Sequence, residues 1–257
     1  MVPSGMFSTA TPVPRLIEPE TDRLWLRQWR AEDRGPFADM CMDPTVMEFL
    51  SSPRDRAATY AAIDKWSAHI AERGWGFWAV ELKQTKEFVG FVGLQVPAEG
   101  HPFLPCVEIG WRLGAKHWGY GYATEGARGA LRVAFEALDL AEVIATTALD
   151  NSRSRAVMER LNMCGPEAKF QHPGVPINSP LRTHVLFRIS RIEWERPAQR
   201  EHLKRQEMEA PMNQAPLKPL VNPLYKIKES LIVAQSADMR VIDQTLAPGE
   251  PWSAIAS

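Results

Sequence analysis

The sequence Trp118-Gly-Tyr-Gly-Tyr-Ala-Thr124 places two closely spaced glycines between an expected strand, Cys106–Leu113, and an expected helix, Thr124–Leu138. Glycines let the backbone approach a ligand closely, and the N–H groups of such a turn and of a helix N-terminus bind anions. Phosphate is therefore the expected ligand. A P-loop is excluded because no Lys follows Gly121, and a dinucleotide-binding fingerprint is excluded because the segment follows an antiparallel meander.

Hydrophobic periodicity on both sides of this segment predicts a mixed α/β fold whose first half is mostly antiparallel. Ser52 is the expected N-cap of a helix with Pro53 in its first position, and Gly74 is its expected stop. The expected strands are 22–29, Gly76–Leu82, Phe88–Gln95, Cys106–Leu113, Val143–Leu149, Lys169–Phe170 and Thr183–Ile192. The expected helices are 31–42, the one from Ser52, Thr124–Leu138 and Asn151–Leu161.

The charge balance of the 257-residue chain argues against nucleic acids and anionic membranes as its main binding partners. It has 30 Lys and Arg against 31 Asp and Glu, whereas chains that mainly bind nucleic acid or anionic membranes carry a basic surplus. No apolar run approaches the ~20 residues that cross a bilayer, and the N-terminus lacks the pattern of a secretory signal. Three widely spaced cysteines suggest a reducing compartment. We therefore expect a cytoplasmic globular protein that binds neither nucleic acid nor membrane.

Prolines divide the chain into three parts. Residues 1–20 are expected to form a disordered lead-in, and residues 21–194 the folded unit. Residues 195–257 are expected to be a linker and irregular tail, because a charged run is followed by repeated prolines. The segment 233–250 faintly resembles the opening strands of a cupin domain. No histidine cluster follows it, so we expect either a truncated remnant that binds no metal or an unrelated surface extension or dimer arm.

Two motifs, in order, resemble the GCN5-related N-acetyltransferase (GNAT) superfamily, in particular its ribosomal-protein-alanine N-acetyltransferase subgroup. The first is the loop 118–125, and the second is Asn151-x-x-Ser154-x-x-Val-Met-Glu-Arg-Leu161. The family's opening and closing strands resemble residues 21–27 and 181–188, so the resemblance spans about 21–194. The family's glycine after the second motif is replaced by Asn162, which also tolerates a left-handed helix end.

The resemblance implies acetyl-CoA as acyl donor and a single domain with a mixed, mostly antiparallel sheet flanked by helices. The sheet would splay between Val107–Leu113 and Val143–Leu149, and the pantetheine arm would pair with the backbone groups left free in this gap. No metal is implied. The residues implied to bind acetyl-CoA are Ile109, Gly110, Trp111, Trp118, Gly119, Tyr120, Gly121, Tyr122, Ala123, Thr124 and Asn151.

Glu108 is the candidate base for the amine, and Ser154 is carried over from the subgroup as the acid that protonates the thiolate. Each has an alternative: Glu108 can pair with Arg112 or Arg128, and Ser154, like Asn151, can cap the helix. A backbone N–H near the splayed strand is the expected oxyanion donor. The sequence places no acid beside either His172 or His184, so we interpret both as structural.

These observations predict an acetyl-CoA-dependent N-acetyltransferase. It would acetylate a primary amine, on a protein N-terminus or a small molecule, by direct attack in a ternary complex. A lysine with a pKa of ~10.4 needs a stronger base than an α-amino group near ~8, so a water chain could serve in place of Glu108. The alternative is a CoA-binding regulatory module that does not catalyse. Either protein could be a monomer or a homodimer.

Overall fold

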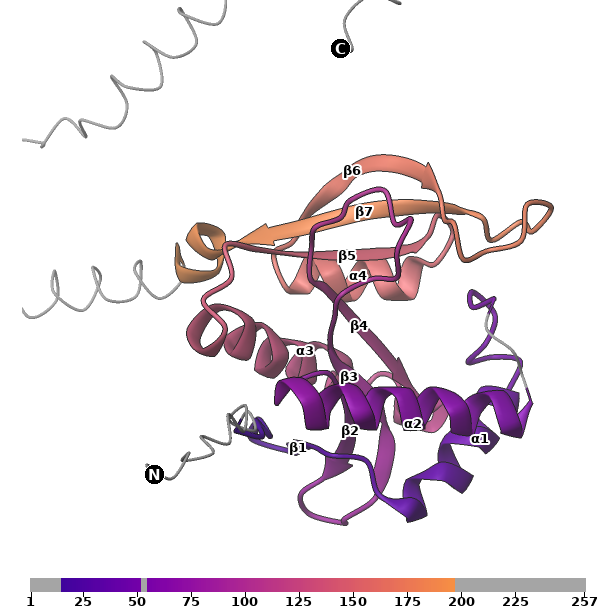
Figure 1. The fold of residues 1–257 in the computed structure, drawn as a ribbon, viewed down its shortest axis with the longest axis vertical. Coiled ribbons are helices and arrows are strands. Elements are labelled where there is room, and N and C mark those ends of the chain that lie inside the picture. Colours follow the sequence, from indigo (N-terminus) through magenta and orange to yellow (C-terminus); the bar gives the residue numbers. More distant parts are fainter. Residues whose placement is uncertain (1–14, 52–54, 197–257) are drawn as a thin grey trace, which may run out of the picture. The chain divides into compact units, whose positions relative to one another are not determined.

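The sheet of this protein is mixed and open at one position (Figure 1). The structure, a computed structural model, describes residues 15–51 and 55–196, which form seven strands in the order β1-β2-β3-β4-β5-β7-β6. All neighbouring strands are antiparallel except β4 and β5. The strands are β1 (Leu24–Arg27), β2 (Phe77–Leu82), β3 (Phe88–Gln95), β4 (Glu108–Leu113), β5 (Glu142–Ala148), β6 (Cys164–Gln171) and β7 (Thr183–Ser190). The expected order of strands and helices is confirmed.

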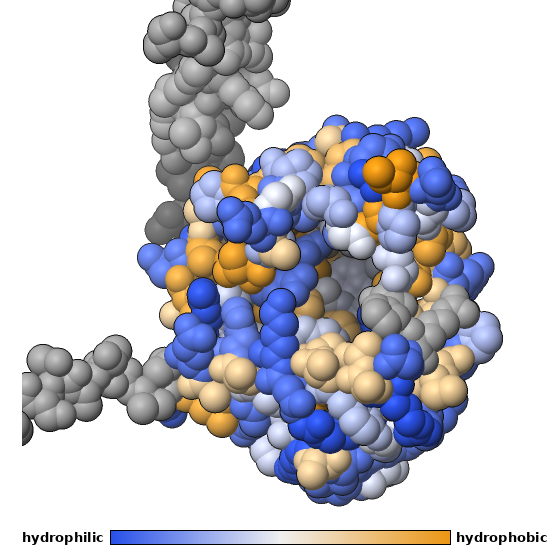
Figure 2. Space-filling view, turned by 45° about the vertical axis from the view of Figure 1, so that its right-hand side comes forward, coloured by the Kyte–Doolittle hydropathy of each residue, from blue (hydrophilic) through white to orange (hydrophobic). Residues whose placement is uncertain are grey.

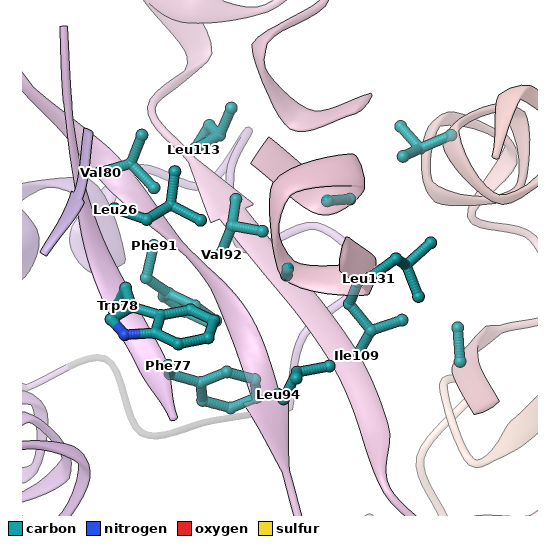
Figure 3. Close-up of a cluster of buried hydrophobic side chains, with 14 of the residues drawn as sticks. Leu26, Phe77, Trp78, Val80, Phe91, Val92, Leu94, Ile109, Leu113 and Leu131 are labelled. Atoms are coloured by element: carbon teal, nitrogen blue, oxygen red, sulfur yellow. The ribbon is translucent and has the colours of Figure 1, made fainter. Parts of the chain in front are cut away.

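The helices lie on both faces of the sheet. Trp66 of α2 contacts Phe77 and Phe91, with ring centroids 5.5 and 4.8 Å apart, so these two side chains point to the α1 and α2 face. Val92 points the other way, toward Gly126 of α3. Figure 3 shows Val92, Ile109 and Leu131 meeting on this second face. The α-helices are α1 (Arg34–Met42), α2 (Arg56–Arg73), α3 (Tyr122–Arg132) and α4 (Ser152–Arg160).

Helix α2 begins later than the sequence suggested. Its N-cap is Asp55, whose side chain accepts a hydrogen bond from the Ala58 N–H at 2.7 Å, and not Ser52. Asp is as good an N-cap as Ser, so the local sequence alone does not choose between them. The end of the helix is confirmed: Gly74 has φ 81° and ends α2 in the left-handed conformation. Asn162, with φ 59°, takes the same conformation after α4.

Helix α3 begins at Tyr122, two residues before the expected start, because Gly121 is its N-cap. The helical region continues through Val133–Ala137 as a π-helical turn, which ends close to the predicted Leu138. The early start matters for the site, because it brings the first helical turn directly against the glycine-rich loop.

The parallel neighbours β4 and β5 meet at one position only, Glu108 opposite Ile144. The Ile144 N–H donates to the Val107 carbonyl at 3.0 Å, and no further pair follows between these strands in the described chain. By contrast, β3 and β4 pair along the whole of β4. The predicted splay of the sheet at this position is therefore confirmed.

Ordered contacts begin before residue 21. Within the expected lead-in, the Ile17 N–H donates to the Gly74 carbonyl, and the Trp78 indole donates to the Ile17 carbonyl, each at 2.8 Å. The expectations for residues 1–14, for the tail from residue 197 and for the cupin-like segment lie outside the described residues. Among the helices of the described ranges, none combines the length and apolar character needed to span a membrane.

Candidate active site

The glycine-rich loop forms a cradle of backbone N–H groups at the start of α3. Gly119 and Gly121 have φ values of 82° and 81°, a conformation that residues with a Cβ rarely adopt. The Glu125 N–H already donates to the Gly121 carbonyl at 3.0 Å. The N–H groups of Tyr122, Ala123 and Thr124 come before it in the first helical turn, where no helical acceptor exists. This geometry suits a pyrophosphate, as the sequence predicts.

Arginines surround this cradle, and sequence reasoning missed them. The Arg23 guanidinium forms an ion pair with Glu125 at 2.6 Å and lies over the Tyr122 ring, 4.7 Å from its centroid. Burial would raise the pKa of Glu125, but hydrogen bonds from Thr21 and Arg23 outweigh it and hold this pKa below its ordinary value. Five further arginines line the same cavity: Arg112, Arg128, Arg132, Arg153 and Arg160. The sequence did contain one sign of these arginines: Arg128 and Arg132 are four residues apart, which places both on the same face of the expected helix.

The aromatic residues of the loop take different positions. Trp118 donates its indole N–H to the Leu113 carbonyl at 2.8 Å, and the Arg153 guanidinium lies 4.6 Å from its ring centroid. Trp118 therefore joins the loop to the end of β4. Tyr120 is 61% exposed, stacks on Tyr122 and is absent from the cavity lining, unlike the other predicted loop residues.

The gap between β4 and β5 exposes backbone groups of β4. The Val107 carbonyl faces β5, and backbone directions alternate along a strand, so the polar groups of Ile109 and Trp111 face β5 as well. The Glu108–Ile144 bridge takes up the Ile109 N–H, and beyond it the described part of β5 offers no partner to the Ile109 carbonyl or to the backbone groups of Trp111. An extended arm that carries amides could pair with these groups, which is the arrangement that the sequence predicts for pantetheine.

One cavity joins the loop to this gap. Its volume is about 1660 Å³, and its lining includes Gly121, Trp111, Glu108 and Ser154. Figure 2 shows the molecular surface hollowed on one side. A cavity of this size accommodates a ligand larger than the usual drug-sized molecule. The structure therefore brings together the predicted residues of the loop, the gap and α4, with Tyr120 as the exception.

Glu108 has different partners from those suggested by the sequence. Its carboxylate accepts hydrogen bonds from the Gln95 amide, at 3.0 Å, and from the Thr146 hydroxyl. Within the described part of the chain, Glu108 forms no ion pair. The alternative that it pairs with Arg112 or Arg128 is therefore wrong, and its partners are Gln95 and Thr146. Glu108 is only 9% exposed. Neither hydrogen-bond donor is a cation, so the carboxylate could still receive a cationic ligand.

Asn151 caps α4, as its helix-capping interpretation predicts. Its side-chain oxygen accepts from the Ser154 N–H at 3.1 Å, and its amide group donates to the Thr147 hydroxyl at 3.0 Å. Both Asn151 and Ser154 also line the large cavity. The capping interaction and a position at the cavity therefore coexist, and the acid role of Ser154 stays a prediction.

Three histidines gather near Glu108, and sequence reasoning did not place them together. The His172 and His184 ring centroids lie 4.6 Å apart, and those of His101 and His172 lie 5.9 Å apart. His172 and His184 line the large cavity together with Glu108. The interpretation of these two as scattered structural residues is therefore incomplete. Across residues 15–51 and 55–196, no three His, Cys, Asp or Glu side chains are grouped as a metal site requires.

The burial of His172 and His184 leads us to expect a lower free energy of unfolding at mildly acidic pH. Burial lowers the pKa of His172, with His184 adding to the effect and Glu108 opposing it. Burial also lowers the pKa of His184, with the Arg182 carbonyl opposing it. Above about pH 6.5 both rings are neutral in the folded and the unfolded chain. Below it the unfolded chain is protonated first, so the free energy of unfolding falls until the lower folded-state pKa is passed.

Urea unfolding at pH 7.5 and 5.5 measures this effect. We expect the wild type to lose more stability between the two pH values than the His184→Phe variant, which removes one titrating ring. Equal losses in the two proteins would show that His184 is not a source of the pH dependence.

Comparisons with known proteins indicate the family of this chain. The family model described as "Acetyltransferase (GNAT) domain" matches residues 23–163. The chain is 36% identical over 181 residues to the FsC-acetyl coenzyme A-N(2)-transacetylase of Aspergillus fumigatus, covering 68% of this chain and 76% of that protein. An acetyltransferase structure from Agrobacterium tumefaciens is 27% identical, with a TM-score of 0.56, covering 68% of this chain and 94% of that one.

A further solved structure, RimJ of Mycobacterium smegmatis in complex with CoA-disulfide, shares the fold. It is 21% identical with a TM-score of 0.51, covering 69% of this chain and 90% of that one. The family model spans more than half of the chain and includes the glycine-rich loop, the splayed strands and α4. This protein is therefore an acetyltransferase of the GNAT family, whose members use acetyl-CoA as acyl donor.

Proposed function

We propose that this protein transfers the acetyl group of acetyl-CoA to a primary amine, on a small molecule or a protein N-terminus, within a ternary complex. The observation that carries the proposal is the single cavity that runs from the N–H cradle of α3 to Glu108. The arginines at the cradle end would neutralise the phosphates of CoA. The carboxylate at the far end would attract an ammonium group. The two ends thus match the two substrates of the reaction.

In the proposed reaction the amine nitrogen attacks the thioester carbon. The carbonyl oxygen becomes an oxyanion, which a β4 backbone N–H such as that of Trp111 would stabilise. The carbon–sulfur bond then breaks, and the sulfur leaves as a thiolate that receives a proton, for which Ser154 is the candidate donor. The ammonium group must first lose a proton, either to Glu108 or to a water chain beside it. Overall, one amide and one thiol form, and one proton is released.

The name of the Aspergillus relative, an N(2)-transacetylase that uses acetyl-CoA, supports a nitrogen acceptor for this chain. The fold shared with RimJ is compatible with the same donor. All three cysteines are free, which supports our placement of the reaction in the cytoplasm.

The test is thiol release from acetyl-CoA by the full-length protein with a panel of small amines and peptides with free N-termini. We expect release with at least one acceptor, together with a higher melting temperature in acetyl-CoA. A melting shift without release from any acceptor would favour the alternative, a CoA-binding regulatory module. No melting shift would refute the assignment of acetyl-CoA to this cavity.

Glu108→Gln tests the acceptor end. Gln keeps the size of the side chain, and its single oxygen can accept from one of the two donors, which bond to different oxygens of Glu108, but it loses the charge and the basic oxygen. For an α-amino acceptor, which needs only about one pH unit of deprotonation at pH 7, we expect kcat to fall about tenfold. The affinity for acetyl-CoA should not change.

The matched control is Glu136→Gln, which removes an exposed carboxylate outside the large cavity. It should leave kcat within about twofold, since surface substitutions away from a site have small effects. A Glu108→Gln variant with the kcat of the wild type would refute a role for this carboxylate.

A further inference from the structure

A second cavity meets the first one at Glu108. Its volume is about 430 Å³, and it lies beside the loop between β3 and β4. Trp66, Phe77, Gln95, Glu108 and His172 line both cavities. A molecule in the second cavity would therefore reach the end of the first cavity with one group. Its volume lies in the range of small-molecule sites.

The lining of the second cavity is mainly apolar and aromatic. Leu94, Val96 and Pro97 contribute to it next to the shared Trp66 and Phe77. Its two carboxylates are Glu108, which is nearly buried, and Glu99, which is exposed, and Lys65 adds one exposed amine. A polycation would need an acidic partner for each of its charges. The lining instead suits one ammonium group, at Glu108, on an apolar body.

His101 indicates that the ligand of the second cavity also carries a polar group. Its ring lines the second cavity and is only 7% exposed, yet neither Nδ1 nor Nε2 has a hydrogen-bond partner in the described chain. Buried polar atoms are nearly always satisfied, so an imidazole with two unpartnered nitrogens is unusual. A ligand oxygen in the cavity would accept a hydrogen bond from the ring nitrogen that carries the hydrogen. The orphaned imidazole thus points to a ligand that carries an oxygen as well as an amine.

His172 lies at the junction of the two cavities in a fixed orientation. Its Nδ1 accepts a hydrogen bond from the Gly174 N–H at 3.1 Å, so in the neutral ring the hydrogen is on Nε2. Burial and the neighbouring His184 lower its pKa, with Glu108 opposing. His101, His184 and Arg182 are the other titratable groups that act on it. At neutral pH the junction therefore presents an uncharged donor that does not repel an ammonium group.

We propose that the second cavity binds the acceptor, a compact primary amine with an apolar or aromatic body and a neighbouring oxygen, such as an α-amino amide. Its ammonium group lies at Glu108, its body lies against Trp66 and Phe77, and its oxygen accepts from His101. This assignment rests on the proposed function, because it names the acceptor of that reaction. The α-amino amide group occurs both in free amino-acid amides and at peptide N-termini, and only the first fits entirely within the cavity.

The test compares four acceptors with the full-length protein and acetyl-CoA. Phenylalaninamide carries all three features, 2-phenylethylamine lacks the oxygen, spermidine is a polycation, and the peptide Phe-Gly-Gly-Gly extends the amide. We expect kcat/KM to be highest for phenylalaninamide, at least tenfold lower for 2-phenylethylamine and lowest for spermidine. The peptide should fall below phenylalaninamide.

Two variants examine the cavity itself. His101→Phe keeps a ring and removes both orphaned nitrogens, so it should raise the melting temperature and raise KM for phenylalaninamide about tenfold, with little effect on 2-phenylethylamine. Ala98→Trp fills the second cavity and should lower kcat/KM at least tenfold for both aromatic amines. Its control is Ala61→Trp, an exposed position of α2 outside both cavities. Acetyl-CoA affinity should be unchanged in all three.

Each outcome of these assays supports or overturns the proposed acceptor site. Release from the aromatic amines that neither Ala98→Trp nor His101→Phe alters would overturn the second cavity as the acceptor site and leave the proposed function standing. A preference for spermidine, or for the peptide, would overturn the proposed class of acceptor. No release with any of the four, or with the wider panel of amines, would overturn the proposed function and this inference with it.

Discussion

Replacing Gly119 with valine is expected to lower the affinity for acetyl-CoA more than about 100-fold, or about 2.7 kcal/mol. Gly119 has φ 82°, and a Cβ built on it meets no atom within 4 Å, so the effect comes from the backbone and not from a clash. A non-glycine residue in this conformation costs about 1–2 kcal/mol, and a β-branched one more. The loop would leave this conformation and turn its N–H groups away from the phosphates. Calorimetric titration with acetyl-CoA measures the loss.

Gly100→Val is the matched control. Gly100 has φ 87°, and a Cβ there also meets no atom within 4 Å, but it lines neither cavity. The variant should therefore suffer the same backbone strain and keep its affinity for acetyl-CoA. Equal losses of affinity in the two variants would show that strain anywhere in the fold, and not the shape of the cradle, controls binding.

Sequence periodicity predicted the elements of this fold well where the signal is local. The observed β3, Phe88–Gln95, coincides with its predicted range, and the left-handed residues Gly74 and Asn162 end α2 and α4 as expected. Such features depend on the conformational preferences of a few adjacent residues. Where two nearby residues are equally good N-caps, as Ser52 and Asp55 are for the start of α2, the local sequence does not choose between them.

The residues of the candidate site also fall into those that the sequence could predict and those that it could not. The glycine-rich loop could be recognised because its residues are contiguous and its φ values require glycine. The histidines could not be grouped from the sequence, since His101 lies in a loop, His172 follows β6, and His184 lies on β7. The pairing of Phe170 with His184 across β6 and β7 places His172 beside His184, and His101 joins them through ring contacts with Phe170 and His172. Register of this kind depends on the whole sheet, so no local pattern records it.

Replacing Arg27 with methionine is expected to lower the free energy of unfolding by about 3–5 kcal/mol. The Arg27 guanidinium is 3% exposed and donates to both oxygens of Asp33, at 2.7 and 2.8 Å, and to Glu81 at 2.8 Å. Methionine fills similar space but leaves two buried carboxylates without this cation. Arg30 also donates to Glu81, at 3.0 Å, and compensates only in part because it is half-exposed. Urea unfolding at pH 7.5 measures the change.

Arg34→Met is the control, because Arg34 forms an exposed ion pair with Asp64, and it should cost less than about 1 kcal/mol. Arg27→Lys separates charge from geometry: lysine keeps the positive charge but cannot donate to both carboxylates in the planar arrangement of a guanidinium. It should therefore lie between the wild type and Arg27→Met. If Arg27→Met were as stable as Arg34→Met, the buried cluster would contribute no more than a surface pair. The end of β1 would then be held to β2 by the backbone ladder and apolar packing alone.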